Sequence, residues 1–223
     1  TQNSPVVSFG TTLTTGAGTV SEEGYNVTDN QQIPPANFSY YDYYSEQFGA
    51  KTTLSSGAAD PIPSGGTVGV YVAGNTGNMT VSGTWDVANG QYVVIFVPGN
   101  LTISTNITVN EGGFLAFIVK GTVTVSENVG YSVPLVNPDK VTQANVTGIY
   151  VSDGQFITQG TTAAPDRQLI VAGTVVADGF TFNRDLEANN SSPGEMFIYR
   201  PDLWAVAPNE LKEVDVTWTE VAP

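Results

Sequence analysis

The feature that most constrains this chain of 223 residues is a sequence repeat with a period of 22 residues. The stretch YVVIFVPGNLTIS begins at Tyr92, and the similar stretch FLAFIVKGTVTVS begins at Phe114. A fixed period of about 20 to 30 residues is typical of a solenoid, in which each repeat is one unit that stacks on its neighbours. The apolar positions that recur at this spacing are Met79, Leu101 and Val123; Val81, Ile103 and Val125; and Trp85, Ile107 and Val129.

The period inside each repeat decides between helical and β coils. Apolar and polar residues alternate in LTIS and again in ITVN, which is the period of a β-strand. β-Branched residues dominate these runs, and Gly or Asn interrupts them every five to ten residues, so each coil should hold about three short strands joined by tight turns. The sequence therefore predicts an all-β, single-domain parallel β-helix, right-handed by the general rule for crossovers between parallel strands.

The repeat also indicates how the domain is organised. We expect about five coils over residues 66–180, because the strand pattern continues in TGIYVSDGQFITQG and RQLIVAGTVVADGF after the strict period ends. Residues 1–65 would supply N-terminal strands and a capping helix, and residues 181–223 a C-terminal cap, all within one globular unit. Such caps are needed because a solenoid exposes strand edges and an open core at both ends.

Both predicted caps differ in composition from the coils. Residues 34–51 carry Asn37 as a candidate helix N-cap and aromatic residues at roughly helical spacing, which predicts a short helix that closes the first coil. Residues 193–223 hold two of the three tryptophans and end in an alternating strand, and we expect them to cover the last coil. Arg200 lies two positions before Asp202, and the two should form a pair that fastens this cap.

Residues 1–33 are rich in Thr and Gly and contain two short β-like runs, PVVSF and TTLTT. Two accounts are open. The runs could pair with the solenoid of their own chain, or they could add to the exposed sheet edge of a neighbouring subunit. The residues of this candidate assembly strand are Val6, Val7, Phe9 and Leu13.

Composition excludes several classes of function. The formal net charge of −14 argues against nucleic acid as a partner, because phosphate binding needs clustered Lys and Arg. The chain has no Cys and no His, which excludes thiol nucleophiles, Ser-His-Asp triads and zinc sites built from those residues.

Two features of the sequence bear on whether the protein is exported. The sequence begins with Thr and shows no signal peptide or transmembrane stretch, so we expect any export signal or membrane anchor to lie upstream. Asn-x-Ser/Thr sequons are frequent and can carry glycans on exported proteins. The candidate glycosylation sites are Asn26, Asn37, Asn145, Asn189 and Asn190.

One segment could carry ligand chemistry. ADGFTFNRDLEANN contains Asp178, Arg184, Asp185 and Glu187, and its oxygens could bind a hard cation such as calcium. We see no matching carboxylates on neighbouring coils, so the interpretation we prefer is an acidic corner loop without catalytic activity. Asp153 and Asp178 each precede Gly, which is ordinary turn chemistry.

The outward strand positions offer another possibility. Hydroxyl residues recur there with the same period of 22 residues, which is similar to the ice-contacting faces of β-helical ice-binding proteins. Threonine also simply suits exposed strand positions and pairs well across strands. The predicted ladder consists of Thr80, Thr102 and Thr124 with Ser82, Ser104 and Ser126.

The stretches GIYVSDGQ, QLIVAGTVVADGF, RDLEANNSSPGEMFIYRPDLW and VTWTEVAP resemble uncharacterised bacterial envelope proteins that carry a pilin-like membrane segment followed by a β-helical exterior domain. The resemblance implies an extracellular or cell-surface structural protein, such as a filament or pilus subunit, with self-association or other surface proteins as partners. It implies no site residues. The alternatives from other classes are a glycan-binding module or carbohydrate-active enzyme, and an ice-binding protein.

Overall fold

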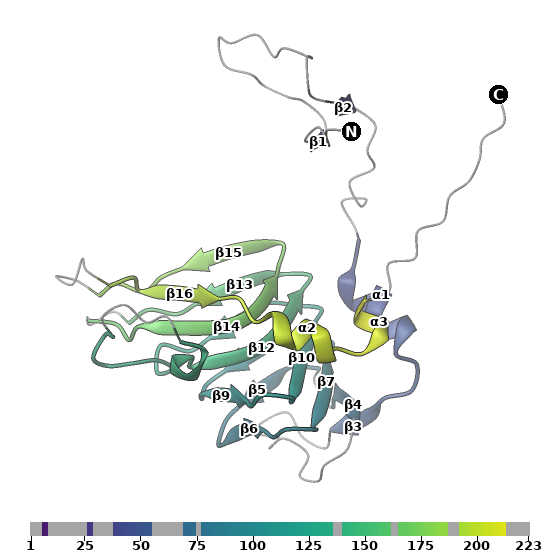
Figure 1. The fold of residues 1–223 in the computed structure, drawn as a ribbon, viewed down its shortest axis with the longest axis horizontal. Coiled ribbons are helices and arrows are strands. Elements are labelled where there is room, and N and C mark those ends of the chain that lie inside the picture. The colour runs from purple at the N-terminus through teal and green to yellow at the C-terminus, as the bar shows by residue number, and fades with distance from the viewer. Residues whose placement is uncertain are drawn as a thin grey trace. The chain divides into compact units, whose positions relative to one another are not determined.

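The computed structural model describes residues 6–8, 26–28, 38–54, 69–74, 77–135, 140–161, 165–186 and 192–212. The chain separates into two compact units, Thr1–Phe38 and Ser39–Pro223, so the boundary falls inside the predicted N-terminal segment 1–65. In the first unit, β1 (Val6–Ser8) pairs in parallel with β2 (Asn26–Thr28). The second unit is the predicted parallel β-solenoid of about five coils (Figure 1).

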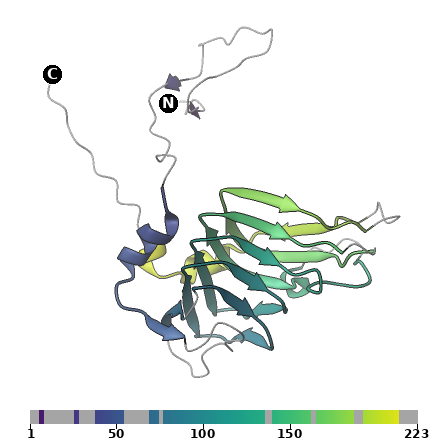
Figure 2. The same cartoon turned by 180° about the vertical axis from the view of Figure 1, so that it is seen from behind.

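Two parallel sheets form most of the solenoid wall (Figures 1 and 2). The larger sheet has the order β16-β14-β12-β10-β7-β4-β3, and the smaller has the order β15-β13-β11-β8-β5. In the first two coils, β6 and β9 form a third side. The bounds in the larger sheet are β3 (Thr52–Leu54), β4 (Gly69–Ala73), β7 (Tyr92–Val97), β10 (Phe114–Val119), β12 (Val146–Ser152), β14 (Leu169–Val176) and β16 (Glu195–Ile198). The others are β5 (Met79–Val81), β6 (Trp85–Val87), β8 (Leu101–Ile103), β9 (Ile107–Val109), β11 (Val123–Val125), β13 (Gln155–Thr158) and β15 (Gly179–Phe182).

The strand register confirms the period of 22 residues. Tyr92 pairs with Phe114, and Met79 pairs with Leu101, which pairs in turn with Val123. The predicted row of Trp85, Ile107 and Val129 departs from the repeat after Ile107, which pairs with Val146. The predicted turn glycines Gly90 and Gly112 have φ values of 75° and 76°, a backbone conformation that favours glycine.

The middle of the larger sheet is buried on both of its faces. β7 and β10 are buried along almost their whole length, whereas β5, β8 and β11 alternate between buried inward residues and partly exposed outward ones. A sheet covered on both faces needs continuous apolar strands, and YVVIFV and FLAFIV are such strands. Three short helices follow or precede the coils and supply part of the cover: α1 (Tyr40–Gln47), α2 (Pro201–Val206) and α3 (Asn209–Lys212). A 3-10 helix, η1 (Val141–Gln143), lies between β11 and β12.

The helix predicted near residues 34–51 is present, but two details of the prediction are wrong. Its N-cap is Ser39, whose hydroxyl accepts a hydrogen bond from the Asp42 amide, and not Asn37, which lies outside the described residues. The helix contacts β10 and β12 instead of closing the first coil. Tyr41 and Phe48 pack edge to face on the outward ring of Phe96, so apolar surface on the outer face of the sheet draws the helix there.

Candidate functional site

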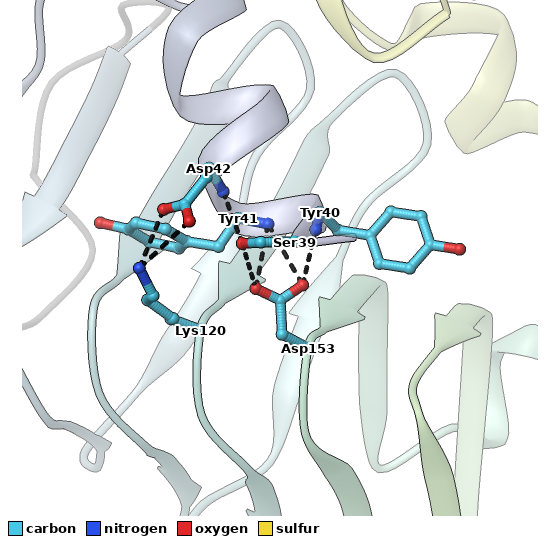
Figure 3. Close-up of polar contacts among 6 residues, drawn as sticks. All are labelled: Ser39, Tyr40, Tyr41, Asp42, Lys120 and Asp153. Atoms are coloured by element: carbon cyan, nitrogen blue, oxygen red, sulfur yellow. Dashed lines mark hydrogen bonds and ion pairs between the residues drawn. The ribbon is translucent and has the colours of Figure 1, made fainter. Parts of the chain in front are cut away.

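A carboxylate at a coil corner fastens α1 to the solenoid (Figure 3). Asp153 accepts hydrogen bonds from the Ser39 hydroxyl at 2.6 Å, the Tyr40 amide at 2.6 Å and the Tyr41 amide at 3.3 Å. These amides belong to the first turn of the helix, where backbone donors have no partner within the helix. The sequence predicts Asp153 only as a turn residue, and its bond to a helix more than 100 positions away leaves no local sequence signal.

A lysine on the next coil adds a second, exposed attachment for the same helix. Lys120 donates to Asp42 at 3.0 Å and lies 5.6 Å from the centre of the Tyr41 ring (Figure 3). The hydrogen bond from Lys120 holds the pKa of Asp42 below its usual value. Both side chains are about half exposed, so this pair orients the helix more than it stabilises it.

The charged residues of the acidic segment 178–187 have different surroundings in the described part of the chain. Arg184 is buried, and its guanidinium donates to the carbonyls of Val129, Arg167 and Ser126 at 2.6 to 2.8 Å. Asp178 and Asp185 are exposed, and Glu187 lies outside the described residues. Among the residues that the structure describes, no group of three acidic side chains is placed to hold a metal ion.

The buried carboxylate in this region has a structural role as well. Asp166 accepts the amides of Thr161 at 2.5 Å and Asp185 at 2.8 Å. Burial by itself raises the pKa of Asp166, but these hydrogen bonds and the nearby Arg184 together lower it below its usual value. Arg184 and Asp166 therefore join backbone segments of successive coils.

The predicted threonine ladder is in register. Thr80 pairs with Thr102 and Thr102 with Thr124, but the next member of the row is Ile157. The three threonines are partly exposed, and the neighbouring Ser126 donates to Glu127. Ser82 and Ser104 each lie two residues after a threonine of the ladder. Ser82 is partly exposed and Ser104 is exposed. The hydroxyl face therefore spans three coils.

The structure describes two of the five candidate glycosylation sites, Asn26 and Asn145. Asn145 is only 3% exposed and its side-chain oxygen accepts the Ile170 amide at 3.0 Å, so a glycan at Asn145 is incompatible with this packing. Asn26 begins β2, where its backbone position is opposite Val6. Asn37, Asn189 and Asn190 lie outside the described residues.

Within the described residues, the solenoid core is partly open at its last coil. One inward row runs Met79, Leu101, Val123, Phe156, Phe180, and the second runs Val81, Ile103, Val125, Thr158, Phe182. Every member of the first four coils is at most 2% exposed, whereas Phe180 is 48% and Phe182 is 51% exposed. The described part of the C-terminal segment covers them only in part, because Phe197 of β16 packs against Phe182 while both Phe180 and Phe182 stay about half exposed. The alternating strand predicted at 214–218 lies outside the described residues.

An apolar groove of about 570 Å³ adjoins these two rings. It is lined by Gly173, Thr174, Val175, Phe180, Phe182, Phe197, Tyr199 and Trp204. Phe182 lies 5.6 Å from Phe197 between ring centres, and the Trp204 indole donates to the Thr174 hydroxyl at 3.0 Å. The lining has no charged side chain. Its two side-chain hydroxyls belong to Tyr199 and to Thr174, which accepts the indole hydrogen bond.

The groove also contains a free strand edge. β16 pairs with only the first half of β14, from Leu169 to Ala172. Residues 173–176 pair with β12 on one side, and no strand in the described part of the chain pairs with their other side. An unpaired strand edge is the backbone feature that an added strand pairs with.

The candidate assembly strand is described in part. Val6 and Val7 belong to β1, which pairs with β2. Phe9 and Leu13 lie outside the described residues. The predicted pair of Arg200 and Asp202 is present, with a buried guanidinium that also donates to the Val109 carbonyl at 2.7 Å.

Comparison with known proteins adds no assignment, since no family model, curated protein or solved structure matches the chain significantly. Within the described residues, no helix has the length and apolar character needed to span a bilayer.

Proposed function

We propose that this protein is an extracellular structural protein that assembles with other copies of itself through its last coil, as a subunit of a filament or pilus-like array. The observation that carries the proposal is the half-exposed pair Phe180 and Phe182 at the end of two otherwise buried rows. Solenoid ends need a polar cap to stay soluble, and an exposed aromatic cluster at such an end is typical of an association surface. The resemblance to envelope proteins and the frequent sequons support an exterior location.

The test is the mass of the purified protein in solution, measured by light scattering over a range of concentrations, together with negative-stain electron microscopy. We expect the mass to rise with concentration and ordered oligomers or filaments to appear. Phe182→Asp should suppress this assembly, because it places a charge on the exposed ring position. Val133→Asp is the matched control, since Val133 is 76% exposed and does not line the groove. A wild-type monomer at every concentration would refute the proposal.

A glycan-binding module is the second candidate function, and one observation favours it. Tyr199 is 66% exposed and lies with Trp204 in the groove, and such rings can stack on sugars. The absence of charged side chains from this lining is less suitable for a sugar, which also needs polar partners. Titration of the protein with oligosaccharides while recording tryptophan fluorescence separates the two: saturable quenching without assembly would favour the glycan-binding module.

A further inference from the structure

We infer that the partner at the last coil is the N-terminal β1–β2 pair of a second copy, which adds to the free edge of β14 and extends the parallel sheet. This inference rests on the proposed function, since it names the segment through which assembly occurs. It commits to one occupant of the aromatic groove, a second copy of the same chain.

The acceptor is defined by its backbone. Residues 173–176 belong to a parallel sheet in which every described pairing is parallel, so a strand added at their free edge continues the sheet in the same direction. The rings of Phe180, Phe182 and Tyr199 stand beside this edge and would pack on an added strand. Backbone hydrogen bonds provide affinity in this mode of recognition, and the side-chain pockets provide specificity.

The donor matches the acceptor in geometry and charge. β1 and β2 pair in parallel, as two further strands of the solenoid sheet would. A two-stranded sheet of three residues a strand is marginal in water by itself and gains stability by joining a larger sheet. Residues 1–21 contain no charged side chain in a chain with a net charge of −14, and the groove lining contains none either. β2 is uncharged as well, whereas Glu22 and Glu23 lie in the connection between the two strands. The strands themselves therefore enter the groove without burying a charge, while the connection stays in water.

The other end of the solenoid does not provide a partner for the open coil. Met79 and Val81 occupy the same two inward rows in the first coil, yet they are 2% and 0% exposed. In these two rows, the first coil therefore has no exposed apolar residue that could stack on Phe180 and Phe182 of a second molecule. Stacking of solenoids end on end is disfavoured, and a separate strand-forming segment is the better candidate.

Donor and acceptor are different surfaces, so the contact is heterologous and propagates from copy to copy into an open chain or a closed ring. This property gives a sharp test with full-length variants. In the donor variant, Val6→Pro and Val7→Pro are combined, because consecutive amides of a strand point to opposite edges and proline removes both. The acceptor variant is Phe182→Asp. Tyr199→Asp serves as a second acceptor variant, since its exposed side chain is less important for folding.

Light scattering and sedimentation should show that each variant alone needs about tenfold or more higher concentration to assemble than the wild type. An equimolar mixture of the donor variant and the acceptor variant should form dimers and stop there, because each supplies the one surface that the other lacks. Gln2→Pro and Val133→Asp should assemble like the wild type. Circular dichroism before mixing confirms that the variants are folded.

The outcomes separate this inference from the proposed function. If the donor variant assembles like the wild type while Phe182→Asp does not, assembly through the last coil stands and strand donation is wrong; contact between two open coils would then be the better account. If the mixture forms no dimer although the wild type assembles, strand donation is also wrong. A monomeric wild type would overturn both proposals and assign the groove to a segment of the same chain or to a different ligand.

Discussion

Asp153 provides the most direct test of how the helical cover is held on the solenoid. Replacing it by Ala removes the acceptor of three hydrogen bonds from Ser39, Tyr40 and Tyr41 and leaves the first turn of α1 with unpaired donors. The helix would then be held mainly by its aromatic contacts with Phe96. Loosening of α1 exposes the outer face of β7 and β10 to water.

The magnitude follows from the geometry of these bonds. A hydrogen bond to a charged group contributes about 1.5 to 3 kcal/mol, and loss of a helix N-cap costs about 1 kcal/mol. Two of the bonds at Asp153 are short and the site is only partly buried, so the contributions are reduced by solvent and do not add fully. We expect Asp153→Ala to lower the free energy of unfolding by about 2 to 3 kcal/mol, and Asp153→Asn, which keeps one acceptor oxygen, by about half as much.

Urea denaturation measures the free energy, and hydrogen exchange of the Phe48 amide, which donates to the Tyr44 carbonyl, reports local opening of α1. Asp178→Ala is the matched control, because Asp178 also precedes Gly at a coil corner and is exposed. It should change stability by less than about 0.5 kcal/mol. The reasoning is refuted if Asp153→Ala and Asp178→Ala have the same small effect, or if exchange at Phe48 does not accelerate.

Three further predictions concern other parts of the molecule. Phe156→Ala should lower the free energy of unfolding by about 3 to 5 kcal/mol and Phe182→Ala by clearly less, because only the second ring is half exposed; equal losses in urea denaturation would contradict the open last coil. The hydrogen bond from Arg200 lowers the pKa of Asp202. The ionised Asp202 therefore stabilises the fold above the ordinary carboxyl pKa of about 4, and this stabilisation is lost as the pH falls through the lowered value. Asp202→Asn should flatten the acid side of the curve of stability against pH, and an unchanged curve would argue against this linkage. If the threonine face contacts ice, Thr102→Tyr should abolish thermal hysteresis, and an unchanged value would remove that alternative.

The coils could be predicted from the sequence because their spacing is local and regular. Rows such as Met79, Leu101 and Val123 need only a constant period, and the strand register reproduces it. The position of α1 could not be predicted in the same way, since it depends on contacts between residues far apart in sequence. One sequence signal does indicate that something covers the outer face of this sheet. A strand with one face in water alternates apolar and polar residues, whereas YVVIFV and FLAFIV are continuously apolar.

The candidate site was harder to predict than the fold. Phe180 and Phe182 lie at inward positions of the β pattern, and inward residues are normally buried. Their exposure depends on where the last coil ends and on where β16 stops pairing with β14, which is a property of the tertiary structure. The acidic segment 178–187 contains both rings, and its Arg184 donates to backbone carbonyls.

The chemical character of Phe180 and Phe182, at the end of the two inward rows, indicates that another layer covers them. The first three coils fill these rows with Met, Leu, Val and Ile, and the last coil places a phenylalanine in both. A solenoid that ended in water would be more stable with polar side chains at these positions, as in the terminal repeats of other solenoids. Covering the exposed half of one phenylalanine removes roughly 100 Å² from water, which contributes about 2.5 kcal/mol. Two such rings beside a free strand edge therefore favour an apolar β-strand as their cover.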